Sequence, residues 1–127
     1  MENKVAKKIL IIDDQQELIS GLATFLKAQG YVILSANDGL YGISQAHKEN
    51  VDLIILDLSL PAGGGFYVLD NLKKSVTTNN IPVIILTASQ EKALEEKAYQ
   101  MGALAYMRKP FEPKELIAKV KELLGDQ

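Results

Sequence analysis

Five polar side chains stand directly after short apolar runs, and together they could bind a metal ion and a phosphoryl group. Asp13 and Asp14 follow ILII, Asp57 follows LIIL, Thr87 follows VIIL and Lys109 follows YMR. Three ionised carboxylates about 4 Å apart repel by about 4 kcal/mol per pair at an effective dielectric constant of 20. Such a cluster needs cations. Lys109 supplies one charge, and a hard divalent ion such as Mg²⁺, which prefers oxygen ligands, would supply two more.

This set of residue types suits phosphoryl transfer. A metal ion and an ammonium neutralise phosphoryl oxygens, and a carboxylate can itself act as the nucleophile and form an aspartyl phosphate. Zinc fits poorly, because the chain has no Cys and a single His, His47, in the polar segment SQAHKEN that we expect on the surface. Any one of these polar residues could simply occupy the turn after a strand, but the set as a whole favours a shared site.

The apolar runs predict five parallel β-strands. They lie at residues 9–12, 32–36, 52–56 and 83–86, with a weaker run at 103–107. The absence of polar alternation is typical of strands covered on both faces, and their short length favours strands over buried helices. In an open parallel sheet the carboxyl ends of all strands lie at one edge, where ligands bind. The five polar residues are therefore expected to share one pocket.

Amphipathic helical patterns separate the strands. In the first helix Leu18, Leu22, Phe25 and Leu26 recur at steps of three and four, and the last helix has the same spacing at Leu116, Ile117, Val120, Leu123 and Leu124. The residues that should begin or end helices are Gly30, Asn37, Asp38, Gly102 and Pro113. The polar stretch 75–80 is typical of a connecting loop. Five βα units in succession predict a doubly wound, three-layer α/β domain.

Composition limits the classes of function. The chain has 127 residues, 47% of them apolar, so we expect one domain over 1–127 with a core at about 7–124. The net charge of −2 gives no attraction to nucleic acid or to an acidic membrane surface. The run ILII stops at two aspartates, too short for a signal sequence or a membrane span. The absence of Cys is compatible with a reducing cytoplasm, which is the expected location.

The ordered set of motifs resembles the response-regulator receiver domains of two-component systems, the CheY-like family. The motifs are IIDD at 11–14, LIILDLSLP at 53–61 with Gly65 eight residues beyond the aspartate, ILTAS at 85–89 and YMRKPF at 106–111. The likeness covers nearly the whole chain. It implies a flavodoxin-like, doubly wound five-stranded parallel sheet of order 2-1-3-4-5 with helices on both faces. It also implies that Asp57 accepts a phosphoryl group from a histidine kinase or a phosphotransfer protein.

The resemblance further implies roles for the other site residues. Asp14, Asp57 and the backbone carbonyl of Ser59 would bind Mg²⁺ or Mn²⁺ directly, with Asp13 contributing mainly through water. Lys109 would pair with the phosphoryl group and Thr87 would hydrogen-bond it. Ser59 and Ser89 occupy positions that tune how water reaches the phosphoryl group in this family.

In this family the signal leaves the site through a packing switch. The resemblance implies that Thr87 is drawn toward the phosphoryl group and that Tyr106 turns into the vacated space. This would change the surface of the fourth helix, fifth strand and fifth helix, where a downstream protein or a missing output domain would bind. Many members carry acids just before the switch aromatic, where this chain has Ala103, Leu104 and Ala105. We therefore expect a monomer or a weak, phosphorylation-dependent dimer.

Two other readings compete with this signalling module, which would catalyse only its own phosphoryl acceptance and loss. One is a Mg²⁺-dependent phosphatase with an aspartyl nucleophile, but enzymes of the haloacid-dehalogenase type want a second Asp two residues later, where this chain has Ser59. The other is a receiver-like scaffold that works without phosphorylation. Retention of every acidic and basic site residue argues against that scaffold.

Overall fold

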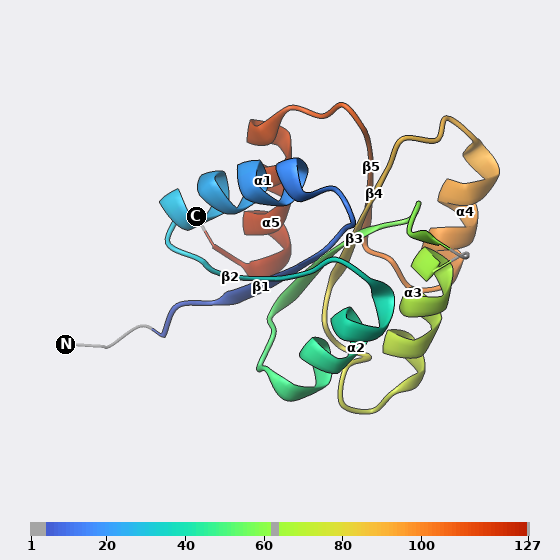
Figure 1. Cartoon of the computed structure of the whole chain (residues 1–127), viewed down its shortest axis with the longest axis horizontal. Helices are drawn as coiled ribbons and strands as arrows, with labels where there is room; N and C mark the ends of the chain where they lie inside the picture. The colour runs from blue at the N-terminus through green and yellow to red at the C-terminus, as the bar shows by residue number, and fades with distance from the viewer. Residues whose placement is uncertain (1–4, 62–63, 127) are drawn as a thin grey trace.

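Strands and helices alternate strictly in the computed structural model, which describes residues 5–61 and 64–126 (Figure 1). The elements are β1 Lys8–Ile12, α1 Gln16–Ala28, β2 Val32–Ala36, α2 Gly39–Lys48, β3 Leu53–Asp57, α3 Gly64–Lys74, β4 Val83–Thr87, α4 Lys92–Gln100, β5 Ala105–Arg108 and α5 Pro113–Leu124. All strand pairs are parallel, and the sheet order is β2-β1-β3-β4-β5. The expected order is confirmed.

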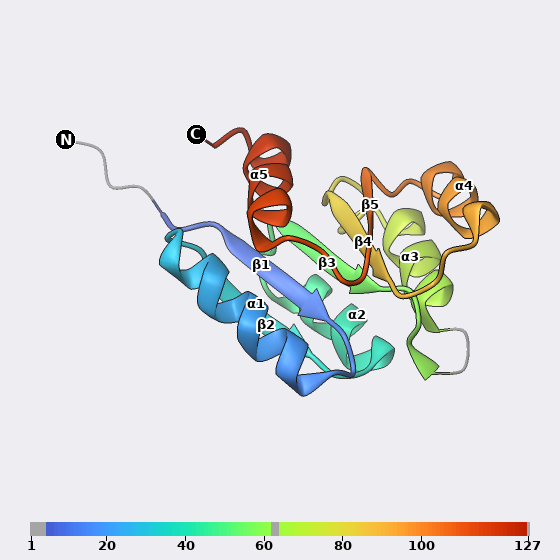
Figure 2. The same cartoon turned by 90° about the horizontal axis from the view of Figure 1, so that it is seen from above.

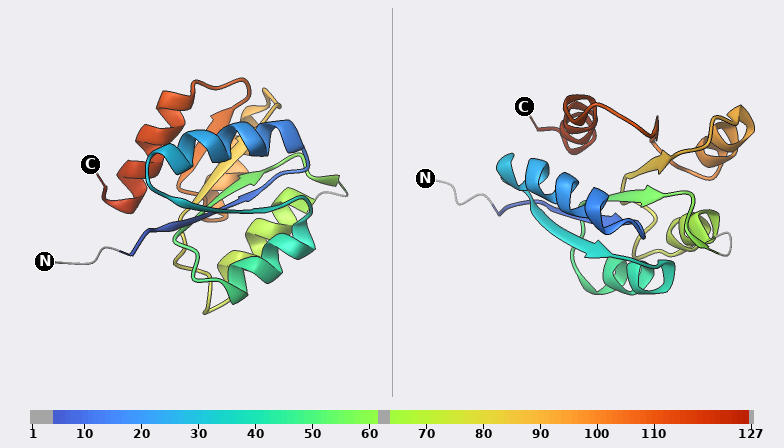
Figure 3. Two further views of the ribbon diagram at one scale, coloured as in Figure 1. Left: turned by 60° about the vertical axis from the view of Figure 1, so that its left-hand side comes forward. Right: turned by 45° about the horizontal axis from the view of Figure 1, so that its top comes forward.

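Helices cover both faces of the sheet. α1 and α5 lie on one side, and α2, α3 and α4 lie on the other (Figures 2 and 3). The core is divided accordingly, since Ile9 and Ile11 of β1 join the cluster that includes α1 and α5, whereas Leu10 and Ile12 join the cluster that includes α2, α3 and α4. All four side chains are fully buried. For β1, β3 and β4 the prediction of burial on both faces is confirmed.

The two edge strands do not fit that prediction. Val32 in β2 is 43% exposed, and Tyr106, Met107 and Arg108 in β5 are only partly buried. Each edge strand pairs with one neighbour, so one side of its backbone and the adjoining side chains lie beyond the helical layers. Uniform apolar character in the sequence did not distinguish these edge positions from the centre.

The fifth strand also begins later than expected, at Ala105 rather than residue 103. Gly102 adopts a φ of 108°, and the N–H of Ala103 donates to the carbonyl oxygen of Ala98 at 3.0 Å. These contacts close the end of α4, so the chain must turn before it joins the sheet. The other four strands differ from the sequence expectation by at most one residue at either end.

The predicted helix boundaries are largely confirmed. Asp38 caps α2 by accepting a hydrogen bond from the N–H of Tyr41 at 2.8 Å, and Pro113 is the first residue of α5. Leu116 in α5 is fully buried as expected. Phe25 is an exception, because it is 48% exposed although its spacing placed it on the apolar face of α1. None of the helices in the described ranges combines the length and apolar character needed to span a bilayer.

A small polar cluster joins the end of α5 to the start of the sheet. The Tyr31 hydroxyl donates to Asp126 Oδ2 at 2.8 Å, and Lys7 Nζ lies 2.9 Å from Asp126 Oδ1. Burial raises the pKa of the Tyr31 phenol to about 12, and the neighbouring Asp126 carboxylate adds to the rise. The cluster fixes the C-terminal end of α5 against β1 and the α1–β2 connection.

Candidate functional site

The predicted site residues meet at the carboxyl edge of the sheet. Asp13 and Asp14 follow β1, Asp57 ends β3, Thr87 ends β4 and Lys109 follows β5. The chain after β1 leads into α1 on one face, whereas the chain after the adjacent β3 leads into α3 on the other. Connections that diverge in this way leave a crevice between neighbouring strand ends. The sheet order therefore brings together side chains that are far apart in the sequence.

Three carboxylates in this crevice could hold a cation. One oxygen each of Asp13, Asp14 and Asp57 lies within 4.8 Å of the others. Asp13 and Asp57 are 1% and 2% exposed, whereas Asp14 is exposed to solvent. Two buried carboxylates beside an accessible one suit a hard divalent ion, which binds through oxygen and keeps part of its water shell. His47 lies exposed in the last turn of α2, as predicted.

Lys109 supplies the fixed positive charge of the site. Its Nζ lies 3.0 Å from Asp13 Oδ2, 3.0 Å from the Gln15 side-chain oxygen and 3.5 Å from Asp57 Oδ2. The ammonium is thus nearer to Asp13 than to Asp57. It balances one of the three negative charges and leaves the pocket with excess negative charge.

Burial dominates the electrostatics of Asp13. Desolvation raises the pKa of this carboxyl above its usual value, and the charge on Asp57 adds to the rise. Hydrogen bonds from the Gln15 N–H, at 2.8 Å, and from Lys109 act in the opposite direction. Ionised Asp13 therefore carries a desolvation penalty, and a bound cation would reduce that penalty.

Backbone turns orient the remaining polar groups. The Ser59 N–H donates to Asp57 Oδ1 at 2.9 Å, and the Ser89 N–H donates to Thr87 Oγ1 at 3.1 Å. Both serines lie two residues beyond the side chain they support, so the chain folds back over each strand end. Gly65 packs against the backbone of Leu58 so closely that a Cβ atom would overlap it. The connection after Asp57 is consequently held against the start of α3.

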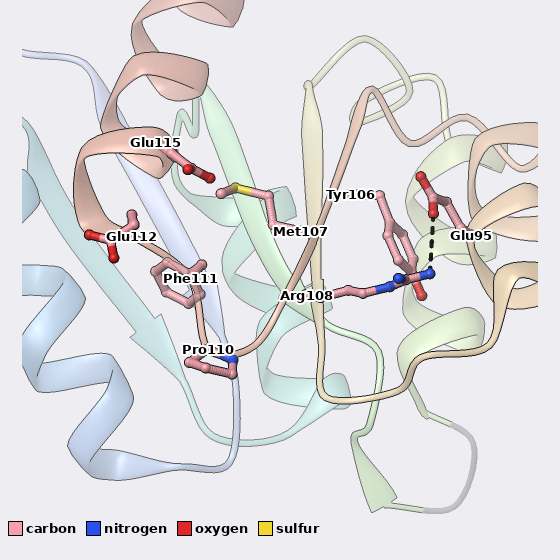
Figure 4. Close-up of a pocket in the computed structure, with 8 residues that line it drawn as sticks. All are labelled: Glu95, Tyr106, Met107, Arg108, Pro110, Phe111, Glu112 and Glu115. Atoms are coloured by element: carbon pink, nitrogen blue, oxygen red, sulfur yellow. Dashed lines mark ion pairs between the residues drawn. The ribbon is translucent and has the colours of Figure 1, made fainter.

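A separate pocket of about 530 Å³ opens beside β5, between α4 and the start of α5. Figure 4 shows Phe111, Glu112 and Glu115 on one side and Arg108, Tyr106 and Glu95 on the other, with Met107 of β5 pointing toward Glu115. Glu95 of α4 lies 3.8 Å from Arg108. The sequence analysis predicted that the fourth helix, fifth strand and fifth helix form a binding surface, but it did not predict a pocket there.

Tyr106 connects this pocket to the acidic site. Its hydroxyl is buried and has no hydrogen-bond partner among the described residues, and its ring centroid lies 6.4 Å from that of Tyr99. Burial raises the pKa of the phenol, and the Thr87 side chain offsets part of that rise. The structure therefore has the Tyr106 hydroxyl inside the protein and Thr87 in its vicinity.

Sequence reasoning overlooked Gln15, the one uncharged side chain that accepts a hydrogen bond from Lys109 in the described residues. Its position directly after the aspartate pair was the available signal. The contact spans 94 positions of sequence, and no local pattern indicates it.

Comparisons with known proteins agree with this geometry. The family model described as "Response regulator receiver domain" matches residues 9–121. The alkaline phosphatase synthesis transcriptional regulatory protein PhoP of Bacillus subtilis is 36% identical over 118 residues, which cover 93% of this chain and 48% of that protein. The chain spans about half the length of the curated relatives it matches.

Solved structures show the same architecture. A CheY-like receiver domain protein from Methanospirillum hungatei superimposes with a TM-score of 0.89 at 27% identity, covering 95% of each chain. The receiver domain of the sensor histidine kinase PA1611 from Pseudomonas aeruginosa has the same fold, with a TM-score of 0.86 at 24% identity over 96% of this chain and 100% of that one. That protein has a magnesium ion coordinated in its active site cleft.

Fold and site together define a parallel α/β signalling domain with an acidic pocket, able to hold a cation, at the carboxyl edge of its sheet. The chain belongs to the family of response regulator receiver domains of two-component systems. Receiver domains are generally signalling modules rather than turnover enzymes, which argues against the phosphatase alternative.

Proposed function

We propose that Asp57 is the phosphoacceptor of this receiver domain. The observation that carries the proposal is the cluster of Asp13, Asp14 and Asp57 with Lys109 beside it, in a chain that belongs to the receiver family. Asp57 is the central carboxylate, since it ends a middle strand of the sheet and lies within reach of both the aspartate pair and the ammonium. The donor would be the phosphohistidine of a histidine kinase or of a phosphotransfer protein.

The chemical step needs little beyond positioning. An Asp57 carboxylate oxygen forms a bond to phosphorus while the phosphorus–nitrogen bond of the donor breaks, and its electron pair stays on the imidazole nitrogen. Lys109 turns an N–H toward the new phosphoryl oxygens, and the Thr87 hydroxyl donates a hydrogen bond to them. Charge neutralisation of this kind is the main protein contribution to phosphoryl transfer.

The residues present fit a magnesium or manganese ion. Asp14 and Asp57, with the backbone carbonyl of Ser59, would bind the ion directly, and Asp13 would contribute through water. The buried Asp13 carboxylate, whose pKa is raised by desolvation, supports this assignment because a nearby cation lowers the cost of its charge. When bound, the ion supplies further neutralisation of the phosphoryl oxygens. Ser59 and Ser89 would then govern access of hydrolytic water.

Phosphorylation would be converted into a change of surface. A phosphoryl group adds a charge of roughly −1.5 to −2 and new acceptor oxygens at Asp57, and these attract Thr87. Tyr106 then moves further into the space that Thr87 leaves, and the proposal is supported by its hydroxyl, which is already buried near Thr87. The surface formed by α4, β5 and α5 would bind a downstream protein or an output domain in a longer chain. We place this exchange in the cytoplasm, with the domain a monomer or a weak, phosphorylation-dependent dimer.

Labelling with a small phosphodonor tests the proposal. Incubation with Mg²⁺ and acetyl phosphate should add one acid-labile phosphoryl group, detected by intact-mass measurement, and the Asp57→Asn variant should add none. Full labelling of that variant would refute the assignment. If the unmodified chain were not labelled and bound its partner equally well with and without a phosphoryl analogue, the scaffold reading would replace it.

A further inference from the structure

Within the described residues the Lys109 ammonium makes two hydrogen bonds and one longer ion pair. It lies 3.0 Å from Asp13 Oδ2, 3.0 Å from Gln15 Oε1 and 3.5 Å from Asp57 Oδ2. An ammonium has three donors and no acceptor. Two of its partners are carboxylates that the proposed function also uses for the cation and the phosphoryl group, and Gln15 is the third.

Gln15 is itself held on two sides. Its N–H donates to Asp13 Oδ1 at 2.8 Å, and its carbonyl oxygen accepts from the N–H of Ile19 at 3.1 Å in the first turn of α1. As the N-cap residue of α1 it makes no side-chain capping hydrogen bond, so its amide is available to Lys109. Asp13, Gln15 and Lys109 thus form a closed ring of hydrogen bonds whose backbone is fixed by the helix.

An uncharged acceptor has a particular advantage at this position. A cation that draws on the negative charge of Asp13 weakens the attraction between Asp13 and Lys109, whereas it has little effect on an amide dipole. A fourth carboxylate would hold the ammonium more strongly, but it would compete with the phosphoryl oxygens for the same N–H groups and add to the repulsion in the pocket.

We propose that Gln15 is a positioning residue, which holds the Lys109 ammonium beside Asp57 while Asp13 is shared with a cation. This inference rests on the proposed phosphoacceptor role of Asp57. In this role Gln15 acts through Lys109, to which its side chain is hydrogen-bonded, and it is assigned no contact with the metal ion or the phosphoryl group. Asp57 contacts Lys109 only through the longer ion pair at 3.5 Å, so the ammonium can turn an N–H to the incoming phosphoryl oxygens and keep its hydrogen bond to Gln15.

The matched pair Gln15→Leu and Gln16→Leu provides the test. Gln16 is the next residue, it is exposed, and it takes no part in the ring. Three quantities are measured on the full chain: proton exchange of the Lys109 ammonium by NMR, the affinity for Mg²⁺, and the affinity for beryllofluoride, a phosphoryl mimic, at saturating Mg²⁺.

In Gln15→Leu we expect faster ammonium exchange, beryllofluoride affinity lower by about fivefold and Mg²⁺ affinity within about twofold, because only the placement of the ammonium is lost. Gln15→Glu retains an acceptor and should restore slow exchange but not beryllofluoride affinity. Gln16→Leu should match the unmodified chain in all three quantities.

A general structural defect in Gln15→Leu would lower the affinity for Mg²⁺ and for beryllofluoride together, and that result would overturn the inference. So would a Gln15→Leu variant that binds beryllofluoride within about twofold of the unmodified chain. Failure of the proposed function is recognised separately, because the unmodified chain would then bind no beryllofluoride, and both proposals would be wrong.

Discussion

Replacing Gly65 by alanine tests how the connection after Asp57 is held in place. Gly65 is the second residue of α3, and a Cβ atom built on it would lie 2.6 Å from Cα and 2.7 Å from the carbonyl carbon of Leu58, and closer still to its carbonyl oxygen. All three contacts are with backbone atoms, which cannot rotate away as a flexible side chain can. Leu58 links Asp57 to Ser59, so any displacement reaches the site directly.

Two opposing terms set the size of the effect. Alanine favours a helix over glycine by up to about 1 kcal/mol. Overlap with a fixed neighbour costs about 1–3 kcal/mol when the structure must shift to relieve it. We expect a net loss of about 1–2 kcal/mol in the free energy of unfolding, which lowers the melting temperature by roughly 3–10 °C for a chain of this length. The affinity for Mg²⁺ should fall as well, because Asp57 and Ser59 move with Leu58.

Gly21→Ala is the matched control. Gly21 lies within α1, it is exposed, and a Cβ atom there has nothing within 4 Å, so only the favourable helix term remains. Urea denaturation of both variants, with and without Mg²⁺, should show Gly21→Ala more stable than the unmodified chain and Gly65→Ala less stable. A Gly65→Ala variant as stable as Gly21→Ala, with unchanged Mg²⁺ affinity, would show that the close approach to Leu58 does not constrain the site.

Two further predictions concern the acidic pocket and the cluster at the end of α5. Asp14→Asn removes one of three mutually repelling charges, so it should not lower stability without metal, yet it should lose most of the roughly 2.7 kcal/mol that Mg²⁺ contributes to the unmodified chain at one hundred times its dissociation constant. Equal Mg²⁺ stabilisation of the two proteins in urea denaturation would contradict the placement of Asp14 as a ligand. Tyr31 has a pKa raised from 10.0 to about 12 in the folded state, so its contribution to stability is complete below about pH 10 and is lost as the pH rises toward 12. The difference in unfolding free energy between the unmodified chain and Tyr31→Phe should be constant from pH 7 to 9 and smaller at pH 11. An undiminished difference at pH 11 would contradict the raised pKa of Tyr31.

Much of the fold could be predicted because its signals are local. Apolar runs of four or five residues mark the strands, and spacings of three and four residues mark the helices. Asp38 and Pro113 act within one helical turn, so their roles follow from neighbouring residues alone. Exposure did not follow in the same way, since Phe25 and Val32 depend on which other elements lie above them.

The candidate site was predicted for a similar reason. Asp57, Thr87 and Lys109 each end or follow an apolar run, and the geometry of a parallel sheet places all such positions at one edge. The sequence therefore named the residues that meet there. It could not say that Lys109 lies nearer to Asp13 than to Asp57, since that depends on how the β5–α5 connection returns across the sheet.

The sequence by itself determined the alternation of strands and helices, the acidic character of the pocket and the identity of its charged residues. Tertiary structure alone decided which oxygen each donor reaches, which apolar residues remain in solvent, and that Gln15 joins the pocket across 94 positions of chain. The physical reason is range. Periodicity and capping act over a few residues, whereas hydrogen bonds and desolvation in the pocket depend on sheet order and helix packing to within a fraction of an ångström.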